Sequence, residues 1–319
     1  MGNRSFREDG SIRKRLINSL DTKGESLQKV DRIRENVFKV TSNKRKYMVK
    51  GFSSTNKLEA QKLLTKKLKE NGFHQTYRFI KSLPDFNYDG MTYSWIEYLN
   101  PSRDKFSYRE AENRSKGLFL LQQFHQTTRS FYKSIPASKY NQLRKWQERL
   151  KLFKSNAGIV RGYVSSRYVD NWIEWGERAL KGMEKFEDDL YKEPNCIIHG
   201  DVAHHNFFNS SGGKLNIIDF DLIHQAPPII DFIQYSNRIM PYVKDASELF
   251  SYPQLKAYKN NPAFLYALLF PADIYREWNR LEREDLYSSN EYMHSIWKLT
   301  VDQYAQRMNL YKDIYKRIN

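Results

Sequence analysis

Two short segments of the chain carry the side chains best suited to chemistry. The first, residues 196–208, contains Asp201 and Asn206 directly after an apolar run, and the second, residues 215–221, reaches Asp219 after another apolar run. Carboxylate and amide oxygens are hard ligands of the kind that magnesium prefers beside substrate phosphates. An acid placed near such a metal can orient a hydroxyl nucleophile. The residue types therefore indicate phosphoryl transfer, which needs mainly alignment and neutralised phosphate charge.

Short strands must position these groups. A strand over residues 195–198 is expected to end at His199, and Asn206 is expected to open a returning strand. Residues 215–218 should pair with that strand through a turn at 210–213 that contains two glycines. This hairpin predicts that Asp201, Asn206 and Asp219 converge at one end of a rigid support.

The preceding part of the chain has the period-two alternation of strands. Three strands are expected over residues 27–33, 36–41 and 46–52, followed by a helix that is capped at 53–55 and stops at 71–72, and by strands over 77–81 and 91–99. After the break at 100–101, spacings of three and four residues predict helices. They are expected over residues 109–127, 139–153, 165–190, 229–239, 264–281 and 290–317.

The expected fold class is therefore α+β. A small antiparallel sheet with one helix should form an N-terminal lobe over residues 27–99, and a larger helical lobe that contains the catalytic hairpin should cover 100–319. Residues 1–26 are polar and basic and are expected to form an N-terminal extension with a short helix.

The motif His-Gly-Asp at 199–201, followed by Asn206 and by Ile-Asp-Phe-Asp at 218–221, resembles the signature of the aminoglycoside phosphotransferase and choline kinase family. The resemblance implies a two-lobed, protein-kinase-like fold and the cofactors ATP and magnesium. It implies transfer of the γ-phosphate to a hydroxyl of a small molecule. The segment 265–276 is also similar to the C-terminal helices of the bacterial spore-coat-associated branch of this family, the CotS and YutH type.

The same resemblance implies roles for individual residues. Asp201 would act as the catalytic base toward the acceptor hydroxyl, and His199 would brace the catalytic loop. Asn206 and Asp219 would bind magnesium. Asp221, which alternates with Asp219 across a phenylalanine, would be a second acid on the metal side or a turn residue.

Nucleotide-binding residues follow in the order that the family has them. Lys50 matches the strand lysine that contacts the phosphates, and Glu59 matches its ion-pair partner on the next helix, although Glu59 also suits a first helical turn. Glu97 and Leu99 lie where the family has its hinge beside the adenine. Asp231 matches an aspartate that supports the catalytic loop.

The expected phosphate-covering loop, residues 31–36, contains no glycine. Glycine lets backbone N–H groups approach a phosphate closely, so its absence weakens the case for tight nucleotide binding. Arg34 can compensate with a side-chain contact. The missing glycine also favours an alternative, a pseudokinase scaffold with a partner in a coat or another assembly. Intact Asp201, Asn206, Asp219 and Lys50 argue against that alternative.

Composition narrows the remaining classes. The chain has 319 residues, 40% hydrophobic residues and no apolar run long enough for a membrane span. Residues 1–6 lack the apolar stretch of a secretory signal, and a single cysteine, Cys196, excludes an intrachain disulfide. We therefore expect a cytoplasmic protein, spore-associated if the coat resemblance holds, with a buried Cys196 thiol.

The formal net charge is +16. A basic surface can attract nucleic acid, but the sequence has no RNA-binding signature, and nucleic acid is the weaker alternative. The charge disfavours a polycationic acceptor and favours a neutral or anionic one, such as a sugar or a phosphorylated metabolite.

Overall fold

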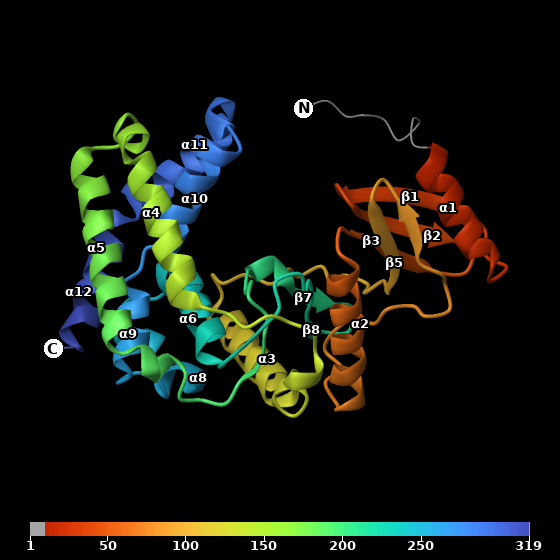
Figure 1. Cartoon of the computed structure of the whole chain (residues 1–319), viewed down its shortest axis with the longest axis horizontal. Helices are drawn as coiled ribbons and strands as arrows, with labels where there is room; N and C mark the ends of the chain where they lie inside the picture. The colour runs from red at the N-terminus through yellow and green to blue at the C-terminus, as the bar shows by residue number, and fades with distance from the viewer. Residues whose placement is uncertain (1–9, 319) are drawn as a thin grey trace. The chain divides into compact units, whose positions relative to one another are not determined.

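The structure is a computed structural model, and it describes residues 10–318. Residues 1–9 and 319, which include the segment expected to lack a secretory signal, lie outside the described part. The chain forms two compact units (Figure 1). The first, here called the sheet unit, holds residues up to 105, 133–137 and 207–221. The second, the helical unit, holds 106–132, 138–206 and the chain from 222 onward.

A five-stranded antiparallel sheet forms the body of the sheet unit, in the order β1-β2-β3-β5-β4. The strands are β1 (Leu27–Arg34), β2 (Val37–Ser42), β3 (Lys46–Phe52), β4 (Phe86–Tyr88) and β5 (Met91–Glu97). The expected strands around 27–33, 36–41, 46–52 and 91–99 are confirmed. The expected strand over 77–81 is wrong, because only Phe79 there forms an isolated bridge, to Ile96. Strand β4 was not expected.

Helix α1 (Gly10–Asp21) belongs to the core of the sheet unit. Its side chains Ile12, Leu16 and Leu20 recur every four residues and are fully buried against the sheet. The described part of the expected N-terminal extension is therefore an integral layer of this unit, because one face of a basic helix is apolar.

Helix α2 (Thr55–Glu70) follows β3 as expected. The Ser54 side chain caps it by accepting a hydrogen bond from the Lys57 N–H, and Asn71 ends it. Leu58 and Leu64 are buried beside the sheet. The helix thus fixes the direction in which its polar side chains point.

The hairpin of β7 (Phe207–Ser210) and β8 (Lys214–Ile217) completes the sheet unit. The predicted pairing is confirmed, with Phe207 opposite Ile217, and the turn carries two glycines with positive φ. The Ile217 N–H donates to the Gln75 carbonyl at 2.9 Å, which ties the hairpin to the segment after α2.

The helical unit is built from helices of 4 to 20 residues. Its helices are α3 (Ala111–Arg129), α4 (Gln142–Arg161), α5 (Ser166–Lys185), α6 (Ile229–Ile239), α7 (Ala246–Leu249), α8 (Pro253–Lys256), α9 (Pro262–Leu268), α10 (Ala272–Arg283), α11 (Asn290–Trp297) and α12 (Tyr304–Lys316). Helices α4 and α5 lie side by side, with α10 against α4 and α9 against α5 (Figure 1). Among residues 10–318, no helix is both long and apolar enough to cross a bilayer.

Three expected helices are interrupted, and one of them, 165–190, ends as an α-helix at Lys185 and is followed by a 3₁₀ turn at Glu187–Leu190. Residues 264–281 form α9 and α10 rather than one helix, because Pro271 lacks an N–H and stands directly before α10. A five-residue π-helical segment, Lys298–Asp302, separates α11 from α12. Strand β9 (His224–Ala226) was not expected. It pairs with β6 (Cys196–Ile198) and lies shortly before α6 in the chain.

Candidate functional site

In the helical unit, a buried carboxylate holds the loop after β6 by hydrogen bonds to the loop backbone. Asp231, in the first turn of α6, is fully buried and accepts hydrogen bonds from the N–H groups of His199 (2.7 Å) and Gly200 (3.0 Å). Its carboxylate also meets the His125 ring from α3 at 2.8 Å. The expected supporting role of Asp231 is confirmed in this geometric sense.

Burial disfavours the ionised form of the Asp231 carboxyl, yet its hydrogen bonds outweigh that cost. The contact with His125 and the N–H of His199 hold the pKa of Asp231 below its usual value. His199 is fully buried, and its Nδ1 lies 3.3 Å from the Asp201 N–H. The loop that carries Asp201 is therefore fixed by groups that lie out of contact with solvent.

Gly200 is required by the path of this loop. Its φ is +76°, and a Cβ atom built on it would lie 2.0 Å from the Leu222 carbonyl oxygen. Backbone atoms cannot give way as a flexible side chain can, so a residue with a side chain would displace the loop.

We expect Gly200→Ala to destabilise the protein by more than the roughly 1–2 kcal/mol that a left-handed alanine costs. Gly212→Ala is the matched control, because Gly212 also has a positive φ (+88°) but has open space around it. Denaturant unfolding of both variants measures the difference. Equal losses in the two variants would show that the close approach to Leu222 is unimportant.

Asp201 lies between two side chains of the helical unit. The Asn206 amide donates to the Asp201 carboxylate at 3.3 Å and to its carbonyl at 2.9 Å. Arg238 of α6 donates to the other carboxylate oxygen at 2.9 Å. Asp201 is thus a positioned, half-buried carboxylate with free space beside it, as a base toward a hydroxyl requires.

The sheet unit gathers the second set of predicted residues. Lys50 on β3 lies 2.8 Å from an Asp219 oxygen and 2.7 Å from an Asp221 oxygen. Between the two acids, Phe220 is fully buried, so the acids face the same ammonium group. Asp219 has a left-handed φ of +67°, a conformation that is uncommon outside glycine.

The predicted pair between Lys50 and Glu59 is wrong. Glu59 is on the exposed side of α2 and pairs with Lys62 at 3.1 Å. The buried face of the helix instead presents Gln61, whose amide donates to Asp221 at 2.8 Å. The reason is helical phase, because Gln61 follows the buried Leu58 by three residues and Glu59 follows it by one.

The remaining residues predicted for the nucleotide site, Arg34, Glu97 and Leu99, also lie in the sheet unit. Arg34 ends β1, and its guanidinium is 3.7 Å from an Asp219 oxygen. The turn between β1 and β2 has two residues, so a glycine loop is absent from this part of the structure. Glu97 ends β5, where its N–H donates to the Arg78 carbonyl at 2.9 Å, and Leu99 follows in the segment after the strand.

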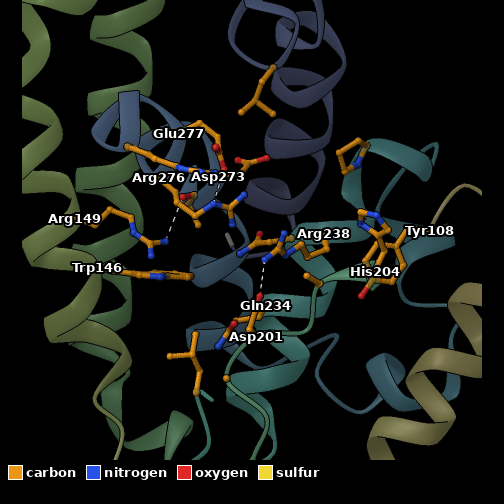
Figure 2. Close-up of a pocket in the computed structure, with 18 of the residues that line it drawn as sticks. Tyr108, Trp146, Arg149, Asp201, His204, Gln234, Arg238, Asp273, Arg276 and Glu277 are labelled. Carbon is orange, nitrogen blue, oxygen red and sulfur yellow. Dashed lines mark hydrogen bonds and ion pairs between the residues drawn. The ribbon is translucent and has the colours of Figure 1, made fainter. Parts of the chain in front are cut away.

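A cavity of about 620 Å³ opens beside Asp201, entirely within the helical unit. Its walls come from α4, the loop after β6, α6 and α10, and they include Arg238, Arg149 and Arg276 (Figure 2). This volume is in the range of pockets that hold a small molecule. His204 lines it as well, and burial and the Arg238 charge lower the pKa of His204, which favours its neutral ring.

Reasoning from sequence missed the arginines of this cavity. A signal for Arg238 exists, because Asp231, Gln234 and Arg238 recur along one face of a helix that is rich in isoleucine. Arg149 and Arg276 each lie among several basic residues in amphipathic helices of a strongly basic chain. Nothing in the local pattern distinguishes them from solvated surface residues.

The donor set fits a hard divalent cation. Within the sheet unit, Asp219 and Asp221 direct carboxylate oxygens to one ammonium position. Magnesium commonly takes only one or two carboxylates and completes its shell with water and phosphate oxygens. Within residues 10–318, no three His, Cys, Asp or Glu side chains form a metal-binding group by themselves. The single thiol is buried as expected, and burial raises the pKa of Cys196.

Solved structures similar to this chain are phosphotransferases. An aminoglycoside phosphotransferase from Alicyclobacillus acidocaldarius matches with a TM-score of 0.71 at 17% identity, covering 92% of each chain. A spectinomycin phosphotransferase in complex with ADP and spectinomycin matches with a TM-score of 0.61 at 15% identity, covering 95% of this chain and 98% of that one. An amicoumacin kinase bound to AMP-PNP and Ca²⁺ matches with a TM-score of 0.54 at 14% identity, covering 91% and 88%.

These likenesses establish the expected kinase-like fold, with a small antiparallel sheet and a mainly helical remainder. A search of curated proteins finds no significant match. The model of the phosphotransferase enzyme family matches residues 31–268, which is most of the chain and includes both motifs. The chain therefore belongs to the phosphotransferase enzyme family.

Proposed function

We propose that the protein transfers the γ-phosphate of ATP to a hydroxyl group of a small molecule, with magnesium as the cofactor. The observation that carries the proposal is the position of Asp201, whose carboxylate is held by Asn206 and Arg238 on the wall of a cavity of about 620 Å³. A hydroxyl that enters this cavity can reach the carboxylate. Family membership supplies the reaction class.

In this proposal the residues of the chain divide the work. Asp201 accepts a hydrogen bond from the acceptor hydroxyl, aligns its oxygen and takes up its proton. Asp219, Asp221 and Asn206 hold magnesium, which when bound neutralises charge on the phosphates. Lys50 and Arg34 contact phosphate oxygens, and the backbone near Leu99 contacts the adenine.

Gln61 takes the place of the glutamate that sequence reasoning expected. It holds Asp221 by a hydrogen bond of 2.8 Å, and the buried Tyr77 hydroxyl lies 3.4 Å from its other amide atom. Lys50 and Asp221 are thereby fixed through an uncharged side chain. This arrangement positions the lysine without a second acid on α2.

Asp219→Ala should abolish binding of ATP with magnesium, because it removes both a metal ligand and a partner of Lys50. The measurement is the nucleotide-induced rise in melting temperature, which reports binding to the folded state. Asp85→Ala is the matched control, since Asp85 is 30% exposed and pairs with Lys62 in the same unit. Unchanged ATP binding in the Asp219 variant would contradict the assignment.

The spore-coat scaffold alternative gains no specific observation in the structure. Asp201, Asn206, Asp219 and Lys50 each make defined polar contacts within their units. A scaffold has no chemical need for these contacts, so the enzyme is the better-supported function.

A further inference from the structure

The cavity beside Asp201 has a strong excess of positive charge. Six cationic side chains line it, and only three carboxylates do, which leaves an excess of three positive charges. The cations are Lys145, Arg149, Arg238, Arg276, Arg280 and Arg307, and the acids are Asp201, Asp273 and Glu277. A cavity of this sign attracts anions and repels polycations.

Four of the six cations have a carboxylate partner within the helical unit. The pairs are Arg238 with Asp201 at 2.9 Å, Arg276 with Glu277 at 2.6 Å, Arg280 with Glu284 at 2.8 Å and Arg307 with Asp273 at 2.5 Å. These four positive charges are therefore partly neutralised by carboxylates of the protein. The charge excess of the cavity must come mainly from the other two cations.

Those two, Lys145 and Arg149, lie one turn apart on α4. Within the described residues 10–318, neither has a carboxylate at ion-pair distance. The Arg149 guanidinium donates to the Ala272 carbonyl at 3.3 Å, and Lys145 stands 4.9 Å from the centre of the Tyr140 ring. Like charges at this helical spacing repel each other, so the pair costs stability when the cavity contains no anion.

Burial and repulsion between cations shift the pKa values of these two side chains. Burial and the Arg149 charge lower the pKa of Lys145, and burial and the Arg276 charge lower the pKa of Arg149. Both shifts have the direction expected when cations are gathered in a partly enclosed space.

Two amide groups on α6 add unused hydrogen-bond donors. The side-chain nitrogens of Gln234 and Asn237 are buried, line the cavity and have no partner within the described part of the chain. Unsatisfied buried donors are costly, so they call for a partner in the functional state. Figure 2 shows Arg149 reaching the cavity from α4, Gln234 and Arg238 from α6, and Arg276 from α10.

We propose that this cavity binds an acceptor that carries a phosphomonoester in addition to its reacting hydroxyl, with Arg149 and Lys145 as the binding residues for that phosphate. The identification of the ligand as the acceptor rests on the proposed function, whereas anion binding itself does not. The reacting hydroxyl lies toward Asp201. The second phosphate lies toward α4.

The arrangement of the donors favours phosphate over carboxylate. Donors reach the cavity from three helices, and a tetrahedral phosphate presents oxygens in several directions, whereas a carboxylate presents two in one plane. A phosphomonoester also carries close to two negative charges at pH 7, which suits two unpaired cations.

The test measures binding of inorganic phosphate to the full chain without nucleotide, by isothermal titration at fixed ionic strength. Acetate and kanamycin serve as comparison probes. Arg149→Gln should weaken phosphate binding about tenfold or more, the loss expected for charge-assisted hydrogen bonds. Arg144→Gln is the matched control, because Arg144 is on the same helix but is 78% exposed and pairs with Glu148. Lys145→Gln provides a second variant if the first does not fold.

Phosphate binding that Arg149→Gln and Lys145→Gln weaken and Arg144→Gln leaves intact would support the proposal. Equal phosphate affinity in all variants, or tighter binding of kanamycin than of phosphate, would overturn it. Acetate binding as tight as phosphate would overturn the phosphate assignment. The phosphate-binding assay contains no ATP, so it does not depend on the proposed function. If the proposed function is wrong, the wild-type protein will bind phosphate but will not turn over ATP.

Discussion

Replacement of Asp201 by asparagine should lower the turnover number for phosphoryl transfer by about a hundredfold to ten-thousandfold, the contribution typical of a positioned general base. Asparagine has nearly the same shape and keeps an oxygen toward Arg238. It cannot take up the hydroxyl proton. We expect the Michaelis constant for ATP to change little, because Asp201 is not among the residues assigned to the nucleotide.

The measurement is steady-state kinetics of ADP release, with ATP-induced thermal stabilisation measured in parallel. Retained stabilisation with lost turnover would separate the chemical role of Asp201 from a general loss of structure. Turnover that survives in Asp201→Asn would mean that another group, or water, accepts the proton.

The second large effect is expected at Asp231. Asp231→Asn should reduce the free energy of unfolding by about 3 kcal/mol, the loss found when one partner of a buried charged network is removed. One carbonyl oxygen cannot accept from the N–H groups of His199 and Gly200 and also from His125. The NH₂ group of the asparagine is itself a hydrogen-bond donor, and it would face one of these N–H donors.

Asp245→Asn is the control, because Asp245 caps α7 at the surface by accepting from the Glu248 N–H at 2.8 Å. Asparagine is as good a cap, so only a few tenths of a kcal/mol should be lost. Denaturant unfolding at pH 7 compares the variants. Equal stability of wild type and Asp231→Asn would show that the hydrogen bonds of the Asp231 carboxylate do not hold the loop.

The pH dependence of this contribution follows from the direction of the shift. The pKa of Asp231 is lower in the folded protein than its usual value of 3.8. The stabilisation by the carboxylate is therefore complete above the unfolded value and is lost as the pH falls below it toward the folded pKa. The stability gap between wild type and Asp231→Asn should stay constant from pH 8 to about pH 5 and close in stronger acid.

The sequence was sufficient for the parts of the fold that local patterns specify. The alternation of 36–41 and 46–52, the helix cap within residues 53–55 and the glycines of the β7–β8 turn each state a local preference, and each was confirmed, with Ser54 as the cap. The spacing of the motif at 199–206 identified the family. That spacing is also a local property, because residues on one loop stay close together in any fold. The role of each motif residue remains a prediction.

Features that depend on packing could not be predicted in this way. The two-residue difference between Glu59 and Gln61 reverses which side chain faces Asp221, and only the seating of α2 decides it. Strand β9 is three residues long and is defined by pairing with β6. The cavity arginines come from α4, α6 and α10, and their proximity is a property of the folded helical unit.

The proposed phosphoryl transfer is tested most directly by following the γ-phosphate itself. Wild-type protein and Asp201→Asn are incubated with γ-labelled ATP, magnesium and a pool of hydroxyl metabolites that includes phosphorylated ones, and the labelled products are separated. We expect a labelled organic product that requires magnesium and wild-type Asp201. Absence of any transfer by wild-type protein that binds ATP, or equal transfer by both proteins, would contradict it.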